Sequence, residues 1–370
     1  MKSAIASIAD DLLSRNNGLL PLAPTFVHRF YPDLNRLNQN RLKRSPRQFI
    51  PERWIGSSVE AVNPAPLPSG GLSMLAAIKA PVALRDVLRE NAIDLLGPTL
   101  TKKHGREFRC LVKILDPGEP IVFHLHANDA QVKKSPATFP GQQFGKDEAY
   151  YFLESPKGPQ PYTHAGLYEG VSRRELVAAV KRGPQHALEL SPVIYQNYEE
   201  GFFVPAATPH RPGTALTLEI QQPSDVYTLL ETHAAGKPMP PEQIHPGFES
   251  LEDAFRLIDF TLAYQVGQLE GNRLVPSSAS KARGGAIDWI FPTSICKKFG
   301  GKRIRVASSL TYSEETPFVL WGWKGRGAIN GRALAPGGEF FVPYASARSG
   351  IELRSTGDEH LEVFSFFPGT

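Results

Sequence analysis

The sequence predicts a mainly β protein made of two barrels and a small helical segment. Its 370 residues include 32 glycines and 33 prolines, a composition typical of many turns between short strands. Apolar runs of strand length are separated by turn signals, as in Phe108–Leu115, Pro117-Gly118 and Ile121–Leu125. A segment at residues 201–210 also recurs at residues 339–348, which predicts two related β units.

Helical patterns are confined to a few short stretches. Apolar residues at helical spacing or capping signals predict helices at the N-terminus (Ile5, Ile8, Leu12, Leu13), at 84–88, at 91–96, after the capping box Ser172 to Glu175, and after Ser250. Residues 20–70 look irregular and proline-rich, and residues 127–147 are too polar and broken for a strand. The pattern therefore favours short strands joined by many turns over long helices.

The internal repeat indicates how the chain divides. Residues 201–210 read Gly-Phe-Phe-Val-Pro-Ala-Ala-Thr-Pro-His, and residues 339–348 read Glu-Phe-Phe-Val-Pro-Tyr-Ala-Ser-Ala-Arg. His210 aligns with Arg348, so the second unit is expected to keep the strands but to bind no metal. We expect an N-terminal extension and first-barrel edge (1–100), a metal-binding barrel (101–226), a helical segment and linker (227–285), and a second barrel without metal (286–370). The Ser, Ala and Gly-rich residues 276–285 are expected to be the loop that joins the two parts.

Four side chains form a candidate metal site. Side chains on a strand alternate between its faces, so His124 and His126 point the same way. Glu148 opens a second apolar run, and His210 follows a third. Three imidazoles and one carboxylate suit a single divalent ion, zinc first, although manganese, iron, cobalt and nickel accept the same ligands. A His-x-His pair on a strand also occurs without a metal, and its position relative to other motifs decides between the two interpretations.

That position resembles the two metal motifs of cupin (jelly-roll) barrels. The turn at Pro117-Gly118 precedes His124 at the cupin spacing, and residues 201–210 resemble the second motif. Five blocks in order are similar to type I mannose-6-phosphate isomerase: Leu111 to Asp116, His126 with Asn128-Asp129, Gly145-Lys146 with Glu148, Val204 to Ala206 with Thr208 to His210, and Glu219 to Gln222 with Ser224-Asp225. The resemblance covers roughly residues 50 to 365 and implies two cupin barrels.

The resemblance also implies roles for further residues. Lys146, two positions before Glu148, matches a lysine beside the substrate, and Lys113 matches one associated with its phosphate. Glu219 and Asp225 match acidic positions near the site and are candidate catalytic groups together with Lys146. From the residues alone, Lys146 fits a solvated loop and Glu219 fits an ion pair within the barrel equally well.

Three positions depart from the family pattern. His124 replaces a glutamine ligand, which gives the three-histidine, one-glutamate set of general cupins. Val122 replaces a serine that helps to hold phosphate, and Leu229 replaces an arginine thought to stabilise developing negative charge. The metal site is therefore expected to carry over better than mannose 6-phosphate as the substrate.

The expected activity is metal-dependent isomerisation of an aldose to a ketose, in the family the conversion of mannose 6-phosphate to fructose 6-phosphate. Such a reaction needs a cation that binds two adjacent oxygens and a group that moves protons. One alternative is an isomerase or epimerase of a different, possibly unphosphorylated, sugar. Others are a sugar-binding protein with the metal as a clamp, and oxidative chemistry at iron.

Composition excludes other partners and compartments. The formal charge of +4 is small for this length and no basic stripe carries interleaved aromatic residues, so nucleic acid is not expected as a partner. The locally basic stretch Arg36 to Arg47 fits a solvated loop. Two cysteines cannot form a disulfide framework, and no signal peptide or membrane span is apparent, so we expect a cytoplasmic monomer or homodimer.

Overall fold

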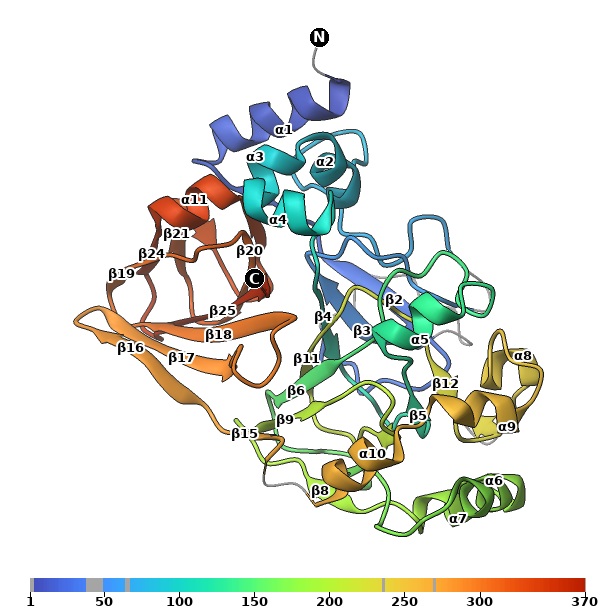
Figure 1. The fold of residues 1–370 in the computed structure, drawn as a ribbon. Helices are drawn as coiled ribbons and strands as arrows, with labels where there is room; N and C mark the ends of the chain where they lie inside the picture. Colours follow the sequence, from blue (N-terminus) through green and yellow to red (C-terminus); the bar gives the residue numbers. More distant parts are fainter. Residues whose placement is uncertain (1–2, 38–48, 64–66, 235–236, 269–270, 370) are drawn as a thin grey trace.

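The computed structural model describes residues 3–37, 49–63, 67–234, 237–268 and 271–369, and it is mainly antiparallel β (Figure 1). The sheets form two groups, one from residues 25–274 and one from residues 277–368 together with residues 20–21, with helices around them. The mainly β character predicted from the sequence is confirmed. Most of the basic stretch Arg36 to Arg47 lies outside the described residues. Within the described part, no helix is both long and apolar enough to span a membrane.

Residues 25–274 contribute two sheets. The larger, which we call the N-terminal sheet, has the order β15-β9-β6-β11-β4-β3-β2. Its strands are β2 (Thr25–Arg29), β3 (Phe49–Ile55), β4 (Leu111–Leu115), β6 (Glu148–Phe152), β9 (Gly201–Val204), β11 (Thr217–Gln221) and β15 (Arg273–Leu274). The smaller has the order β12-β5-β10-β7-β8, from β5 (His124–Leu125), β7 (Tyr162–Ala165), β8 (Val193–Tyr195), β10 (His210–Arg211) and β12 (Thr228–Leu229).

Residues 277–368, together with residues 20–21, form two further sheets. The larger, the C-terminal sheet, has the order β1-β23-β20-β25-β18-β17-β16, from β1 (Leu20–Pro21), β16 (Ser277–Ala282), β17 (Gly285–Phe291), β18 (Phe299–Val306), β20 (Phe318–Lys324), β23 (Glu339–Val342) and β25 (Leu361–Pro368). The smaller has the order β19-β24-β21-β22, from β19 (Ser309–Tyr312), β21 (Gly327–Ile329), β22 (Arg332–Leu334) and β24 (Ile351–Ser355). A short hairpin joins β13 (His233–Ala234) to β14 (Lys237–Pro238).

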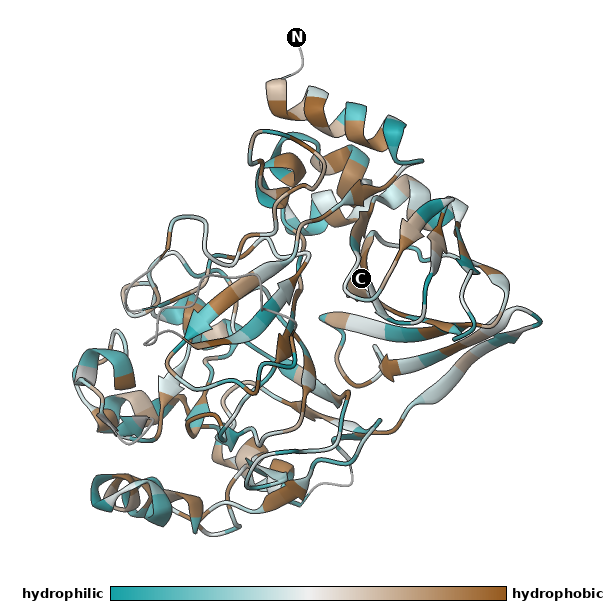
Figure 2. Ribbon diagram, turned by 180° about the vertical axis from the view of Figure 1, so that it is seen from behind, coloured by the Kyte–Doolittle hydropathy of each residue, from teal (hydrophilic) through white to brown (hydrophobic). Residues whose placement is uncertain are grey.

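Short helices flank the sheets. They are α1 (Ala4–Arg15), α2 (Leu84–Glu90), α3 (Ala92–Leu96), α4 (Pro98–His104), α5 (Asp129–Lys134), α6 (Arg173–Arg182), α7 (Pro184–Leu188), α8 (Pro241–Ile244), α9 (Leu251–Ala254), the 3-10 turn η1 (Phe255–Leu257), α10 (Phe260–Gly267) and α11 (Tyr344–Ser349). Polar and apolar residues alternate along α1 (Figure 2), and its apolar side is buried. The hydroxyl of Ser172 accepts a hydrogen bond from the amide of Glu175 and so starts α6 at the predicted place.

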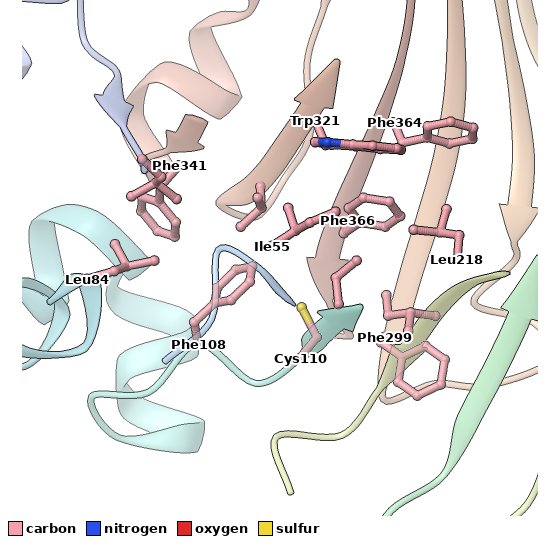
Figure 3. Close-up of a cluster of buried hydrophobic side chains, with 14 of the residues drawn as sticks. Ile55, Leu84, Phe108, Cys110, Leu218, Phe299, Trp321, Phe341, Phe364 and Phe366 are labelled. Carbon is pink, nitrogen blue, oxygen red and sulfur yellow. The ribbon is translucent and has the colours of Figure 1, made fainter. Parts of the chain in front are cut away.

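The largest buried core joins the two groups of sheets. Figure 3 shows Leu218 from the N-terminal sheet close to Phe364 and Phe366 from the C-terminal sheet. Across the same boundary, the rings of Tyr151 and Phe364 meet edge to face with centroids 5.9 Å apart. Residues of α1 to α4 extend this cluster. Because the core is shared, the site-bearing sheets are supported by the C-terminal half.

Several sequence expectations were wrong in detail. The expected loop at 276–285 instead contains β16, which pairs with β17 at the edge of the C-terminal sheet. The stretch 20–70 contains three strands. Residues 127–147 contain no strand, as expected, but they do contain α5, which Asn128 and Gln131 start with a reciprocal capping box. The repeat ends after Pro343, since the chain there enters α11, whereas the first copy continues to β10. Arg348 lies on that helix, exposed, and not at a position equivalent to a strand ligand.

Candidate metal centre

Strands from two sheets bring four potential ligands together. His124 on β5 lies directly opposite His210 on β10, and His126 follows β5 on the same face. Glu148 is the first residue of β6 in the N-terminal sheet. The candidate ligand atoms of these four buried residues all lie within 4.8 Å of one another. The structure therefore brings together the four residues that the sequence analysis selected as metal ligands.

Backbone carbonyls fix the direction of each imidazole. Nδ1 of His124 lies 2.6 Å from the carbonyl oxygen of Val122, and Nδ1 of His126 lies 2.7 Å from that of Val226. Nδ1 of His210 lies 3.0 Å from the carbonyl oxygen of Thr208. Donation of each Nδ1–H to a carbonyl leaves Nε2 as the free electron pair, which is how metal-binding histidines are usually oriented.

The centre of the cluster suits a cation. Nε2 of His210 lies 2.8 Å from Oε1 of Glu148, and the Lys146 ammonium lies 2.7 Å from Glu148 Oε2 and 3.0 Å from His126 Nε2. Buried imidazole nitrogens thus converge on one carboxylate, a donor set that is typical of a divalent metal site. His124, His126, Glu148 and His210 could bind one metal ion.

The protonation states of these groups match that role. Burial lowers the pKa of His126 to about 3 and that of His124 well below its usual value. Burial alone would raise the pKa of Glu148, but the charge of Lys146 and the neighbouring imidazoles hold it well below its usual value. Neutral imidazoles and an ionised carboxylate are the forms that coordinate metals, because a bound proton occupies the same electron pair.

A pocket opens over the cluster and contains the other predicted site residues. Lys113, Lys146, Glu219 and Asp225 line it together with His124 and His126. Together with the open solvent at its mouth, the space in this pocket measures about 580 Å³. The structure therefore places all eight residues selected from the sequence in or directly beneath one pocket.

The pairing of three strands explains how the polar residues meet. Glu219 on β11 lies opposite Lys113 on β4 and opposite Tyr150 on β6. Lys146 reaches this row from the loop before β6, with its Nζ 3.2 Å from Glu219 Oε1. Burial raises the pKa of Glu219 to about 8, against the opposing effect of Lys146 and Lys113. A carboxyl group that still holds its proton near neutral pH thus lies next to an ammonium group.

Asp225 is held by a network that the sequence analysis missed. Its carboxylate accepts hydrogen bonds from Arg29 (2.9 and 3.0 Å), Lys113 (3.0 Å) and the amide of Val62 (2.8 Å). Arg29 also binds Glu52, with Nε 2.8 Å from Oε1. Burial would raise the pKa of Asp225, but these cations lower it well below its usual value. Asp225 therefore remains ionised and orients the two cations around it.

Some of the missed residues carried a signal. Tyr150 lies two positions after Glu148 on the same strand, so the alternation of faces places it beside the cluster, where its hydroxyl donates to Glu148. Tyr31 is likewise two positions after Arg29, and its hydroxyl donates to Glu52 at 2.7 Å. The link from Arg29 to Asp225 spans 196 positions and no local pattern marks it.

Gly145 is required where the loop before Lys146 meets the segment after β5. A Cβ at this position would lie 2.5 Å from the carbonyl carbon of Asn128 and 2.6 Å from the carbonyl oxygen of Ala127. The amide of Gly145 donates to Asp129 and that of Lys146 to Ala127, so the two segments cannot separate without losing hydrogen bonds.

Gly145→Ala is therefore expected to lower the free energy of unfolding by about 1–3 kcal/mol, as overpacking does. Chemical denaturation would measure this. Gly271→Ala is the matched control, because a Cβ there meets no atom within 4 Å. Equal stability of the two variants would show that the segments can move apart freely.

Of the comparisons with known proteins, the one with solved structures identifies the fold. No protein-family model matches the sequence, and no curated protein matches it. Among solved structures, the mannose 6-phosphate isomerase from Bacillus subtilis has 18% sequence identity and a TM-score of 0.67, over 94% of this chain and 99% of that chain. A putative mannosephosphate isomerase from Archaeoglobus fulgidus has 15% identity and a TM-score of 0.66, over 95% and 98%.

A mutant phosphomannose isomerase from Salmonella typhimurium has 13% identity and a TM-score of 0.67, over 95% of this chain and 100% of that chain. Such identities are too low to transfer a reaction, because one fold hosts many functions. The likeness extends over nearly the whole of each chain, so the protein has the fold of the mannose-6-phosphate isomerases.

Proposed function

We propose that the protein is a metal-dependent isomerase that interconverts an aldose and a ketose. It would bind one divalent ion, zinc first, through His124, His126, Glu148 and His210, and each half of the chain would form one cupin barrel. The observation that carries the proposal is the convergence of four correctly oriented ligands beneath a pocket that also holds Lys146 and Glu219. Three imidazoles and a carboxylate fit zinc.

The reaction moves hydrogen between two neighbouring carbons. A proton must leave C2 of the aldose, one must arrive at C1, and the hydroxyl proton on O2 must pass to O1. A bound divalent ion supplies Lewis acidity toward the carbonyl and hydroxyl oxygens of the sugar. The remaining task, moving protons, falls to side chains of the protein.

Lys146 and Glu219 are the groups placed to move protons. Nζ of Lys146 lies between Glu148 Oε2 and Glu219 Oε1, at 2.7 and 3.2 Å. The carboxylate of Glu148, together with that of Glu219 when it is ionised, more than offsets the effect of burial and raises the pKa of Lys146 above its usual value, so Lys146 holds its proton. Ionised Glu219 would take the proton from C2 and return it to C1, Lys146 would deliver a proton to O1 and recover one from O2, and Asp225 would hold Lys113 against the substrate.

Lys146→Met is expected to lower kcat by about 10²–10⁴, the usual contribution of a general acid or base, while the metal content stays at one ion per chain. Ketose formation from a panel of aldoses that includes mannose 6-phosphate, with metal analysis of each preparation, measures both. Lys134→Met, an exposed lysine at the end of α5, is the matched control and should retain full activity. Unchanged turnover in Lys146→Met would remove this residue from the mechanism.

A sugar-binding protein without turnover is the second candidate. The saturation of Asp225 by Arg29, Lys113 and a backbone amide favours it, since a locked network binds without exchanging protons. Saturable sugar binding with no product from any member of the panel would establish it and contradict the isomerase.

A further inference from the structure

The pocket over the metal ligands is lined by both polar and apolar side chains. The polar groups include candidate ligands, Lys146 and the network of Arg29, Glu52, Lys113 and Asp225. The apolar groups, which we call the apolar side, come from β12 and from the loops next to β2, β5 and β12: Phe30, Ile121, Val122, Val226, Tyr227 and Leu229. A ligand that fills the pocket therefore also contacts apolar groups.

The apolar side begins directly beside the first ligand. Leu229 lies opposite His124 in the pairing of β12 with β5, and directly opposed side chains on antiparallel strands are within about 4.5–5.5 Å. Val122 precedes His124 by two positions. Both are buried and pack with Ile244 in a small cluster that is separate from the main core. Packing behind Leu229 and Val122 holds this surface in place.

The cations among the described pocket-lining residues are already bound to carboxylates. Arg29 uses Nε for Glu52 and Nη2 for Glu52 and Asp225, while its Nη1 donates to Val62 and Asn63. Its donors are therefore fully used.

The two lysines are also paired with carboxylates. Lys113 pairs with Asp225 at 3.0 Å, and Lys146 pairs with Glu148 and Glu219. Phosphate binding normally relies on an arginine fork, a lysine or amides at a helix N-terminus that are free to face it. A phosphate placed here would have to compete with carboxylates for every one of these cations.

We propose that the substrate is an unphosphorylated aldose whose far end is deoxygenated, such as a 6-deoxyhexose with its terminal methyl group against Val122 and Leu229. This inference rests on the proposed function and names the substrate class of the same site. The polar half of the sugar, with its carbonyl and adjacent hydroxyl, would face the metal ligands and Lys146. Replacing a terminal hydroxyl by hydrogen removes a polar group that the apolar side cannot hydrogen-bond.

The test compares three forms of the same aldohexose: the parent sugar, its 6-deoxy analogue and its 6-phosphate, in both the D and L series. Zinc-loaded protein is assayed for ketose formation, and binding of each sugar is measured separately by titration calorimetry. The expected order of kcat/KM and of affinity is 6-deoxy first, the parent sugar several-fold weaker, and the 6-phosphate at least 100-fold weaker. Preference for the 6-phosphate, in turnover or in binding, would overturn the inference.

Two variants of the apolar side sharpen the comparison. Leu229→Arg adds a guanidinium there. It is expected to shift the ratio of the affinity for the 6-phosphate to that for the 6-deoxy sugar by at least tenfold toward the 6-phosphate. Leu229→Met keeps the volume and the apolar character and should preserve the wild-type order. If Leu229→Arg fails to fold, the wild-type order still decides the proposal.

The outcomes separate the inference from the proposed function. Binding in the expected order without turnover would leave the inference standing and contradict the isomerase. Turnover with the 6-phosphate preferred would support the isomerase and contradict the inference. Neither binding nor turnover of any of these sugars would contradict both.

Discussion

Replacement of His210 by alanine is expected to leave the protein without a tightly bound metal ion. The side chain is fully buried, lies opposite His124 across β5 and β10, and places its Nε2 2.8 Å from Oε1 of Glu148 within the cluster. Mutating groups that merely orient a ligand weakens metal binding about 10–100-fold, so loss of the ligand itself should cost on the order of 1000-fold. Metal analysis after dialysis and competition with a chelating dye would measure this loss.

His164→Ala is the matched control for this variant. His164 lies on β7, next to β10 in the same sheet, and its Nδ1 is 3.1 Å from the carbonyl oxygen of Ser191. This histidine is half-buried and pairs with Arg211, which faces away from its neighbour His210, and it lines a separate pocket, so its loss should leave the metal content unchanged. A His210→Ala protein that keeps one tightly bound ion would show that the donor set is a different one.

Thermal unfolding gives an independent measure of the same site. A ligand that binds only the folded state stabilises it by about 2.7 kcal/mol at 100 times its Kd. Added zinc should therefore raise the Tm of the wild type and of His164→Ala but not that of His210→Ala. This comparison needs no knowledge of the substrate.

The ligands were predictable because local rules determine their placement. The alternation of faces on a strand puts His124 and His126 on one side, and the same rule relates Lys146 to Glu148. The order of the motifs along the chain then indicated that the strands next to His126, Glu148 and His210 would lie close together. What the sequence could not show was the register between strands, which brings Glu219 opposite Lys113. The network of Arg29, Glu52 and Asp225 depends on that register and went unseen.

The errors in the fold have physical causes. Residues 277–282 are mostly small and polar, so they lack the alternation of apolar and polar residues that predicts a strand. They form β16 because they pair with β17. The missed helix α5 is only six residues long, too short for a periodic apolar pattern, and only its capping box at Asn128 marked it. After Pro343, the two copies of the repeat diverge because one continues into a ligand-bearing strand and the other into a helix.

Arg53→Met is expected to lower the free energy of unfolding by about 3–5 kcal/mol, because it breaks a buried ion pair on one side only. Nη2 of Arg53, on β3 of the N-terminal sheet, lies 3.0 Å from Oε2 of Glu339, on β23 of the C-terminal sheet. The other carboxylate oxygen of Glu339 accepts a hydrogen bond of 2.8 Å from the amide of Gly56. Without Arg53, the buried negative charge has lost its counter-ion at the boundary between the two groups of sheets.

The pH dependence of stability tests whether the unpaired charge of Glu339 causes this loss. Burial raises the pKa of Glu339, against the opposing effect of Arg53, so a glutamate without that partner takes up a proton more readily than the unfolded chain does. A raised folded-state pKa favours the folded state at low pH, and that advantage is lost as the pH rises. The deficit of Arg53→Met relative to the wild type should therefore shrink as the pH is lowered from 8 toward the ordinary glutamate value of about 4.3.

Removing both charges should restore much of the stability. The double variant Arg53→Met with Glu339→Gln leaves no buried charge, so it is expected to be more stable than Arg53→Met alone, and a double-mutant cycle in denaturant gives the coupling energy. Arg354→Met, at an exposed pair with Glu352 on β24, is the control and should change stability by no more than about 0.5 kcal/mol. If Arg53→Met unfolds like this control, the two groups of sheets do not depend on the ion pair, and the shared apolar core alone holds the site-bearing half in place.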